Sequence, residues 1–302
     1  MTDCLIINEV GPRDGLQNQP VLVSAADKIQ LVRRLQAAGL AQVEIGSFVS
    51  PKAVPQMATT EEVLAALGAA TPGFSVLIPN MKGLERAQAA GAREVAVVLS
   101  ATETMNQKNI NMSIERTTEV CAEAVVAAAA AGMRAKAYVA VAFECPFEGP
   151  TSPAVVAALA ARMIEAGAAE VVIADTIGAA APMQVRRMMQ DLVAAHGAQC
   201  VSGHFHDTRG MALANCFASI EAGVRKFDSS VGGMGGCPFT PNAAGNLATE
   251  DLALMAEQSG FSTGVHFPEL IEAIDLASQI TGRELGGRSL QWLRRRYAAR
   301  AA

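Results

Sequence analysis

Short apolar runs alternate with helical segments along almost the whole chain, and this alternation limits the possible folds more than any other feature. The runs lack the polar alternation of a strand with one face in water, so they predict strands buried on both faces of a parallel sheet. We expect eight strands, at residues 4–10, 41–46, 74–78, 94–100, 135–142, 170–175, 200–206 and 226–231. The segments between them, such as 24–39 and 152–167, begin with a capping serine and end with a glycine, as helices do.

Eight strand–helix repeats favour an α/β fold of the closed (β/α)8 type, a TIM barrel. An open doubly wound sheet is the alternative. The chain has 302 residues and no Pro- or Ser-rich linker divides it. We therefore expect residues 1–302 to form a single barrel domain, with residues 260–302 as a helical C-terminal extension packed on the barrel.

The composition argues against several classes of function. A hydrophobic fraction of 51% can fill a large core, while a net charge of −5 argues against a nucleic-acid partner. The most apolar stretch, residues 124–133, is about half as long as a membrane-spanning helix, so no membrane partner is expected. The first residues lack a signal-peptide pattern and the six cysteines are scattered, which predicts a cytoplasmic protein.

Two of the four histidines, His204 and His206, lie two residues apart where the seventh strand is expected to end. Residues i and i+2 of a strand face the same side, so both imidazoles should point at one spot. A lone His204 would be typical of a packed core, but the pair, together with Asp14 after the first strand, indicates a metal site. With the amide oxygen of Asn246 the set contains no thiolate, which suits octahedral Mg2+ or Mn2+ better than tetrahedral zinc.

Other polar residues also gather where the carboxyl ends of the strands are expected, which is where TIM barrels place their active sites. They are Arg13 and Gln17 after the first strand, Glu44 in the second, Asp175 at the end of the sixth and Cys237 after the eighth. Glu44 and Asp175 could instead be strand-end residues that hold loops. Cys237 follows a glycine-rich stretch, so we expect its thiol on a mobile loop at the barrel mouth.

Six motifs, in this order along the chain, resemble those of the hydroxymethylglutaryl-CoA lyases. They are EVGPRDGLQNQ (9–19), SFVSPK (47–52), ADTIG (174–178), HFHDT (204–208), GGCP (235–238) and GNLATEDL (245–252). The resemblance runs from about residue 5 to residue 265. The Arg-Asp-Gly-x-Gln and His-x-His patterns also occur in a wider superfamily of metal-dependent barrels that includes isopropylmalate synthases, whereas GPRDGLQN, SFVSPK and GGCP narrow the resemblance to the lyases.

The resemblance implies cleavage of 3-hydroxy-3-methylglutaryl-CoA into acetyl-CoA and acetoacetate, a reaction of leucine degradation and ketone-body formation. It implies an acyl-CoA substrate, a homodimer or higher homo-oligomer, and a divalent metal held by Asp14, His204, His206 and Asn246. It implies catalytic roles for Arg13, Asp14, Glu44, His204 and Cys237, and substrate contacts for Arg13, Gln17 and Asp175. Arg13 would hold the thioester carbonyl, Glu44 would fix the arginine, and Cys237 would lie on a loop that closes over the site.

The sequence departs from the usual pattern of these lyases at Arg209, Met211, Glu144 and Gln19–Pro20. None of these positions is a proposed metal ligand, but they leave the identity of the acyl group open. Citramalyl-CoA or an isoprenoid-extended glutaryl-CoA is an alternative substrate, and a Claisen-type synthase or aldolase is an alternative activity. A non-enzymatic barrel that binds CoA or a metal is a third alternative, against which the complete set of expected site residues argues.

Overall fold

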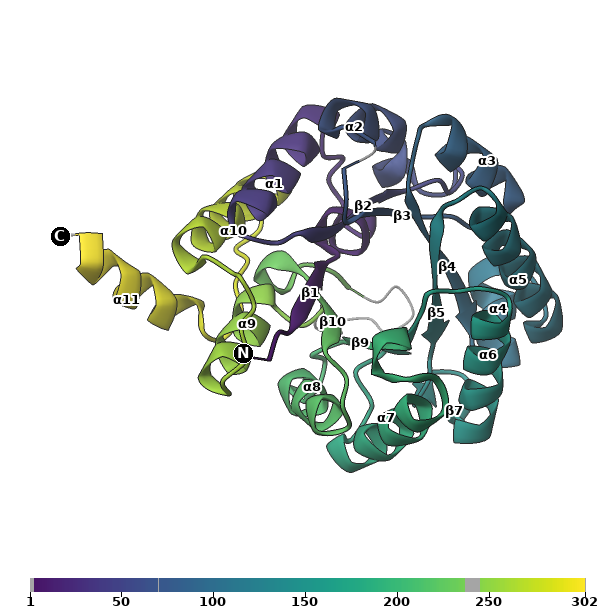
Figure 1. Ribbon diagram of the computed structural model, residues 1–302. Helices are drawn as coiled ribbons and strands as arrows, with labels where there is room; N and C mark the ends of the chain where they lie inside the picture. Colours follow the sequence, from purple (N-terminus) through teal and green to yellow (C-terminus); the bar gives the residue numbers. More distant parts are fainter. Residues whose placement is uncertain (1–2, 70, 237–244, 302) are drawn as a thin grey trace.

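The computed structural model confirms the closed barrel and rules out the open sheet. It describes residues 3–69, 71–236 and 245–301. Within these ranges, parallel strands close on themselves in the order β1-β10-β9-β8-β5-β4-β3-β2 (Figure 1). The barrel strands are β1 (Ile6–Glu9), β2 (Gln42–Ser47), β3 (Phe74–Leu77), β4 (Glu94–Ser100), β5 (Arg134–Ala140), β8 (Glu170–Asp175), β9 (Val201–Phe205) and β10 (Lys226–Ser229).

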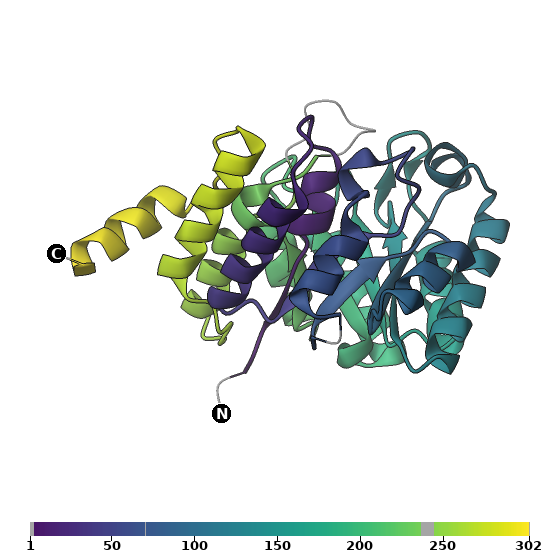
Figure 2. The ribbon, with the colours of Figure 1, turned by 90° about the horizontal axis from the view of Figure 1, so that it is seen from above.

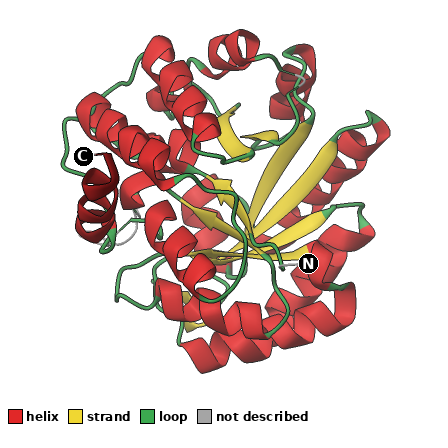
Figure 3. Cartoon of the chain, turned by 60° about the vertical axis from the view of Figure 1, so that its left-hand side comes forward, coloured by secondary structure: helices red, strands yellow, loops and turns green. Residues whose placement is uncertain are grey.

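Helices enclose the strands on the outside of the barrel (Figure 3). They are α1 (Ala25–Ala37), α2 (Thr60–Leu67), α3 (Met81–Ala89), α4 (Glu103–Ile110), α5 (Ile114–Ala130), α6 (Pro153–Glu165), α7 (Pro182–His196), α8 (Ala212–Glu221), α9 (Thr249–Gln258) and α10 (Phe267–Thr281). A further helix, α11 (Leu290–Ala301), follows them. A small ribbon of β6 (Glu144–Cys145) and β7 (Gly149–Pro150) follows β5. None of the helices in the described ranges is long and apolar enough to cross a membrane.

The boundaries of α1 follow from local chemistry that the sequence shows. The Ser24 hydroxyl accepts a hydrogen bond from the backbone N–H of Asp27, which satisfies one of the free donors of the first turn. Gly39 then leaves the helix at a φ of +87°, where a Cβ atom would collide with the carbonyl oxygen of Gly264. Only glycine fits this turn, so the chain passes directly from α1 toward β2.

The strand expected over residues 135–142 ends earlier, at Ala140, because the backbone changes direction at the next residue. Val141 has a φ of +49°, an uncommon conformation for a β-branched residue. Two threonine side chains hold it: the Val141 N–H donates to the hydroxyl of Thr176, and its carbonyl accepts from the hydroxyl of Thr151. Side chains from two neighbouring loops therefore terminate this strand, which its own sequence does not show.

The C-terminal helices lie at one side of the molecule, in the region where the sequence predicts an extension. Helix α10 packs beside α1, whereas α11 projects away from the barrel (Figures 1 and 2). The Asp251 carboxylate accepts hydrogen bonds from the backbone N–H groups of Arg288 and Ser289, just before α11 begins. The ring of Tyr297 stacks on Phe267, with 5.9 Å between the ring centroids. These contacts attach the projecting helix to α9 and α10.

The barrel interior contains a buried lysine, Lys136 of β5, which is 1% exposed. Its ammonium nitrogen lies 3.5 Å from a carboxylate oxygen of Glu94. Burial alone would lower the pKa of this lysine, but surrounding carboxylates raise it. They belong to Glu94, Glu170, Glu44 and Asp228. Lys136 therefore stays charged and balances negative charge from several strands.

We predict that Lys136→Met lowers the free energy of unfolding by about 3–5 kcal/mol, because removing one partner of a buried ion pair leaves uncompensated charge in the interior. Urea unfolding of both proteins, followed by circular dichroism, measures this difference.

Lys28→Met is the matched control. Lys28 is also buried, but its ammonium group donates to the carbonyl oxygen of Gln56 and to the hydroxyl of Thr59 rather than facing carboxylates. We expect a smaller loss of about 1–3 kcal/mol, typical of an uncompensated buried polar partner. Equal losses in the two variants would contradict the charge-balancing role of Lys136.

Candidate metal and active site

Asp14, His204 and His206 come together at the carboxyl end of the barrel. One possible ligand atom from each residue lies within 4.8 Å of those of the other two. The histidines come from the end of β9, and their ring centroids are 5.2 Å apart. Asp14 comes from the helical turn Gly11–Gly15 that follows β1. The two-residue period of the seventh strand therefore brings the imidazoles together as the sequence predicts.

The helical turn that carries Asp14 is held by a buried carboxylate at the end of β1. Glu9 accepts hydrogen bonds from the N–H groups of Gly11 and Val231, at 2.7 and 3.0 Å, and from the Thr249 hydroxyl at 2.6 Å. A Cβ atom at Gly11 would lie 2.6 Å from the Glu9 carboxylate, so glycine is required at this close approach. Glu9 thus links the start of the chain to the segment after β10.

Asn246, the fourth predicted ligand, lies beside Asp14. Its backbone pairs with that of His206, and its side-chain nitrogen donates to Asp14 Oδ2 at 2.7 Å and to the Met234 carbonyl at 3.2 Å. The side-chain oxygen, Oδ1, is buried and has no hydrogen-bond partner in the described part of the chain. A buried acceptor without a donor is costly, and a cation would satisfy it.

The protonation states of these groups suit a divalent cation. Burial alone would raise the pKa of Asp14, but the charge of Arg13, aided by the two histidines, lowers it to about 2. Burial and the neighbouring His204 lower the pKa of His206 to about 4, so its imidazole is neutral at neutral pH. His206 Nδ1 is also buried and has no hydrogen-bond partner among the described residues. An ionised carboxylate, two imidazoles, of which that of His206 is neutral, and an amide oxygen fit a site for Mg2+ or Mn2+.

Arg13 connects the metal cluster to a second buried carboxylate. Its Nε donates to Glu44 Oε2 at 2.5 Å, and its Nη1 donates to Asp14 Oδ1 at 2.6 Å. Glu44 is fully buried and Arg13 is 6% exposed. No described residue accepts a hydrogen bond from Arg13 Nη2. The arginine is therefore oriented through two of its nitrogens, and the third is available to a ligand.

The remaining predicted site residues are Gln17, Asp175 and Cys237. Gln17 follows the same helical turn, and its side-chain oxygen is buried without a hydrogen-bond partner in the described ranges. Asp175 ends β8, where its two oxygens accept from the N–H groups of Ala179 and Ala180 at 2.8 and 3.0 Å. These bonds are those of a loop-holding residue, the alternative that the sequence leaves open, and a substrate contact for Asp175 stays a prediction. Cys237 lies outside the described residues.

Sequence reasoning missed three residues that contact the centre from inside the barrel. Asp228 of β10 lies 3.0 Å from His204 Nδ1, and Tyr138 and Asn8 donate hydrogen bonds to Asp228. Burial alone would raise the pKa of Asp228, but the hydrogen bond from His204 and nearby positive charges lower it. Burial alone would lower the pKa of His204, but Asp228 raises it. The sequence feature that could have identified Asp228 is its negative charge within the strand expected at residues 226–231.

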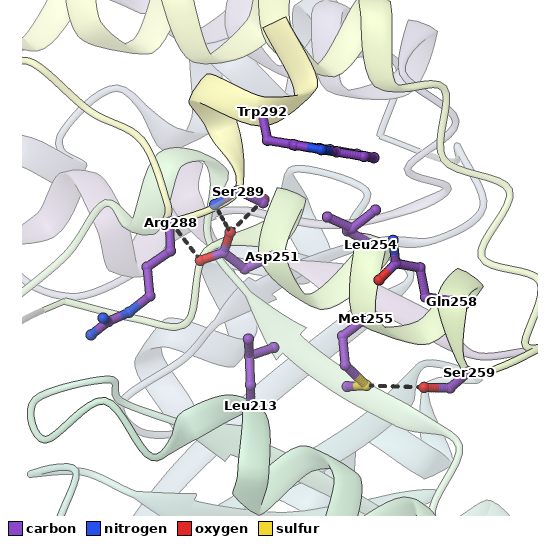
Figure 4. Close-up of a pocket in the computed structure, with 9 residues that line it drawn as sticks. All are labelled: Leu213, Asp251, Leu254, Met255, Gln258, Ser259, Arg288, Ser289 and Trp292. Atoms are coloured by element: carbon purple, nitrogen blue, oxygen red, sulfur yellow. Dashed lines mark hydrogen bonds between the residues drawn. The ribbon is translucent and has the colours of Figure 1, made fainter. Parts of the chain in front are cut away.

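A surface depression between α8, α9 and α11 is separate from this centre (Figure 4). Its lining residues are Leu213, Asp251, Leu254, Met255, Gln258, Ser259, Arg288, Ser289 and Trp292. The set includes none of the predicted site residues. The carboxylate within it, Asp251, is already engaged by Arg288 and Ser289 at the base of α11, as the dashed lines show. The depression therefore reflects how α11 is attached and offers no second set of convergent ionisable groups.

Comparisons with known proteins agree with the fold and identify the family. A hydroxymethylglutaryl-CoA lyase of Pseudomonas mevalonii is 45% identical over 85% of this chain and 86% of its own length. A Pseudomonas aeruginosa lyase named for both 3-hydroxy-3-isohexenylglutaryl-CoA and hydroxymethylglutaryl-CoA is 42% identical over 94% of this chain and 95% of its own.

Among solved structures, an HMG-CoA lyase from Acinetobacter baumannii in complex with coenzyme A and 3-methylmalate superposes with a TM-score of 0.91 at 37% identity. The superposition covers 96% of this chain and 95% of that one. Residues 4–277 also match the HMGL-like protein family, which spans the whole barrel described above. The chain therefore belongs to the HMGL-like family.

Proposed function

We propose that this protein is a carbon–carbon lyase that cleaves 3-hydroxy-3-methylglutaryl-CoA into acetyl-CoA and acetoacetate. The observation that carries the proposal is the cluster of half-buried Asp14 with the buried His204 and His206, in which Arg13 donates a hydrogen bond to Asp14. In a member of the HMGL-like family whose relatives at 42–45% identity bear the name of this activity, the cluster supplies the chemistry that the reaction needs.

The reaction requires loss of the proton of a tertiary alcohol and cleavage of the bond between C2 and C3. A divalent metal bound by Asp14, His204, His206 and Asn246 would lower the pKa of the substrate hydroxyl and orient the substrate. We propose Mg2+ or Mn2+, because the ligands are two oxygens and two imidazoles. The buried Asn246 Oδ1 and His206 Nδ1, which have no partner among the described residues, support this choice of ligands.

Arg13 has the geometry to stabilise the charge that cleavage produces. As the bond breaks, negative charge builds on the thioester oxygen, and a fixed cation at this oxygen lowers the barrier. Glu44 and Asp14 fix two guanidinium nitrogens, so Nη2 can donate to that oxygen without a loss of side-chain freedom during the reaction. Glu44 acts here as a positioning residue for the arginine.

The new carbanion of acetyl-CoA must then receive a proton. His204 Nδ1 is bonded to Asp228, so a His204 that binds the metal through Nε2 has no nitrogen left for proton transfer. We therefore assign the proton to the thiol of Cys237, which the sequence places on a glycine-rich loop at the barrel mouth. The expected homo-oligomer and the expected cytoplasmic location stay predictions.

For the acyl group of the substrate, an isoprenoid-extended glutaryl group is a specific alternative. The Pseudomonas aeruginosa relative is named for an isohexenyl-extended substrate as well as for hydroxymethylglutaryl-CoA. Arg209, one of the departures from the usual pattern, donates to the carbonyl oxygens of Gly178, Ala179 and Ala180 in the loop after β8. This loop follows Asp175, the last residue of β8, so the departure changes the rim of the barrel rather than the metal cluster.

A substrate panel tests the reaction and the acyl group together. Purified protein with Mg2+ is incubated with hydroxymethylglutaryl-CoA, isohexenylglutaryl-CoA or citramalyl-CoA, and the thioester products are identified by mass spectrometry. We expect acetyl-CoA and acetoacetate from hydroxymethylglutaryl-CoA. Cleavage of another panel member with none of this substrate would replace the acyl assignment, and no cleavage at all would overturn the lyase proposal.

His206→Ala tests the metal assignment. Removing one of four ligands should weaken Mn2+ binding at least about 100-fold, judging from the 10–100-fold effect of changing even the residues that support ligands. Isothermal titration calorimetry of the metal-free protein measures the affinity. The control is His196→Ala at the end of α7, which should bind Mn2+ as the wild type does. Unchanged binding in His206→Ala would remove this histidine from the site.

Arg13→Lys tests the stabilising cation. Lysine keeps the charge but loses the planar fork that pairs with Glu44 and Asp14 at once, so kcat should fall about 100-fold while KM changes little. The matched control is Arg34→Lys, which alters an exposed arginine paired with Glu272 on the surface. A kcat near that of the wild type in Arg13→Lys would show that the arginine does not act on the transition state.

A further inference from the structure

Three neighbouring strands place Asn8, Asp228 and His204 side by side inside the barrel. In the parallel register, Asn8 of β1 is opposite Asp228 of β10, and Asp228 is opposite His204 of β9. Paired residues of a parallel sheet face the same side. All three side chains are buried, with exposures of 1%, 3% and 7%. The barrel itself therefore sets the contact between this carboxylate and a proposed metal ligand.

The hydrogen bonds of Asp228 show that it accepts, rather than donates, the hydrogen bond with His204. Its Oδ1 accepts from the side-chain nitrogen of Asn8 at 2.7 Å, and its Oδ2 accepts from the Tyr138 hydroxyl at 2.8 Å. Oδ2 also lies 3.0 Å from His204 Nδ1. An ionised carboxylate only accepts hydrogen bonds, so Nδ1 must carry a proton. If Nδ1 were unprotonated, its lone pair would face a lone pair of the carboxylate oxygen in a buried site, and the two would repel each other.

A proton on Nδ1 leaves the lone pair of neutral His204 on Nε2, the nitrogen with which it can bind a metal. Carboxylates that accept from the second nitrogen of a ligand histidine fix the tautomer and the ring orientation and increase the basicity of the ligand. The ring edge of Tyr138 meets His204 in a T-shaped contact, with 6.1 Å between the ring centroids, which further restricts the imidazole. His206 has no such partner in the described part of the chain, because its Nδ1 is buried and unbonded.

We propose that Asp228, held by Asn8 and Tyr138, is a positioning residue that keeps His204 as the Nδ1–H tautomer with Nε2 directed to the metal, and thereby sets the metal affinity of the site. This inference rests on the proposed metal-binding role of His204. It adds a buried carboxylate from β10 to a centre otherwise built from β1, β9 and the segment around Asn246.

Asp228→Asn is the main test, because asparagine keeps the shape and removes the charge. The metal-free full-length protein is titrated with Mn2+, and free Mn2+ is measured by electron paramagnetic resonance. We expect binding about 10–100-fold weaker than in the wild type. In nuclear magnetic resonance spectra of [15N]histidine-labelled protein, the His204 ring nitrogen signals should change from those of the Nδ1–H tautomer to those of a mixture of tautomers. A merely structural role would not produce this spectroscopic change.

Two further variants keep the test decisive if Asp228→Asn does not fold. Tyr138→Phe removes one hydroxyl donor and keeps the carboxylate, so we expect Mn2+ binding to weaken by roughly 2–10-fold, less than on removal of the charge. Ser202→Ala is its matched control on β9: this buried hydroxyl donates to Glu170 at 2.7 Å, and among the described residues no hydrogen bond or ion pair joins Glu170 to His204. Ser202→Ala should leave Mn2+ affinity unchanged.

The outcomes separate this inference from the proposed function. If the wild type binds Mn2+ while Asp228→Asn or Tyr138→Phe binds it equally well and keeps the Nδ1–H signal of His204, the positioning role is overturned and the metal site stands. If the wild type binds no Mn2+, both proposals are overturned. Equal weakening in Tyr138→Phe and Ser202→Ala would show a general effect of buried carboxylates, which also overturns the specific role of Asp228.

Discussion

Charge pairing in the closed interior of the barrel is the constraint on which the rest of this structure depends. Ionisable side chains from several strands meet in a space with little water, where an unpaired charge costs several kcal/mol. Arg13 meets this requirement through Glu44 and Asp14, and Lys226 of β10 meets it through Glu170. Asp14 is adjacent to Arg13, but the Arg13–Glu44 and Lys226–Glu170 pairs join residues that are far apart in the chain, so the barrel must form before these charges are compensated.

The same pairing sets the protonation states that the chemistry needs. The positive charge of Arg13 keeps Asp14 ionised, whereas burial and a neighbouring imidazole keep His206 neutral. A metal ion requires both conditions, because a protonated carboxyl has lost the negative charge that attracts the cation and an imidazolium group has no free lone pair on its nitrogens. The interior charges thus hold the fold together and also prepare a cation site at one end of it.

The sequence predicts those features that depend on local periodicity. The alternation of apolar runs and helices leads to the barrel, and the two-residue spacing of His204 and His206 leads to their shared direction. It could not predict the contact between Asn8 and Asp228, which are 220 residues apart and meet only because the last strand pairs with the first. A charged residue in a predicted strand does not identify its partner until the register of the closed sheet is known.

Asp175 shows the reverse difficulty. The family resemblance implies a substrate contact for Asp175, which stays a prediction, and its two oxygens also accept hydrogen bonds from backbone N–H groups of the following loop. Almost every residue has a backbone N–H, so the sequence does not show which of these groups donate to a given carboxylate. Position alone therefore could not distinguish a loop-holding carboxylate from one that binds substrate. The same limit applies to Val141, whose strained backbone is held by two threonines from other segments.

Glu44 is important for the orientation of Arg13, because Asp14, the other carboxylate that holds the arginine, has further partners. Asp14 Oδ1 accepts from Arg13 and Oδ2 accepts from Asn246, and the same carboxylate is a proposed metal ligand. A metal ion bound by Asp14 would draw electron density from its carboxylate and would weaken the hydrogen bond on which Arg13 partly depends. Glu44 is not a proposed ligand, and its Oε2 holds Arg13 Nε independently of the metal. Glu44 would therefore keep the arginine oriented if Asp14 bound the cation, so that one centre could hold a metal ion and a guanidinium group side by side.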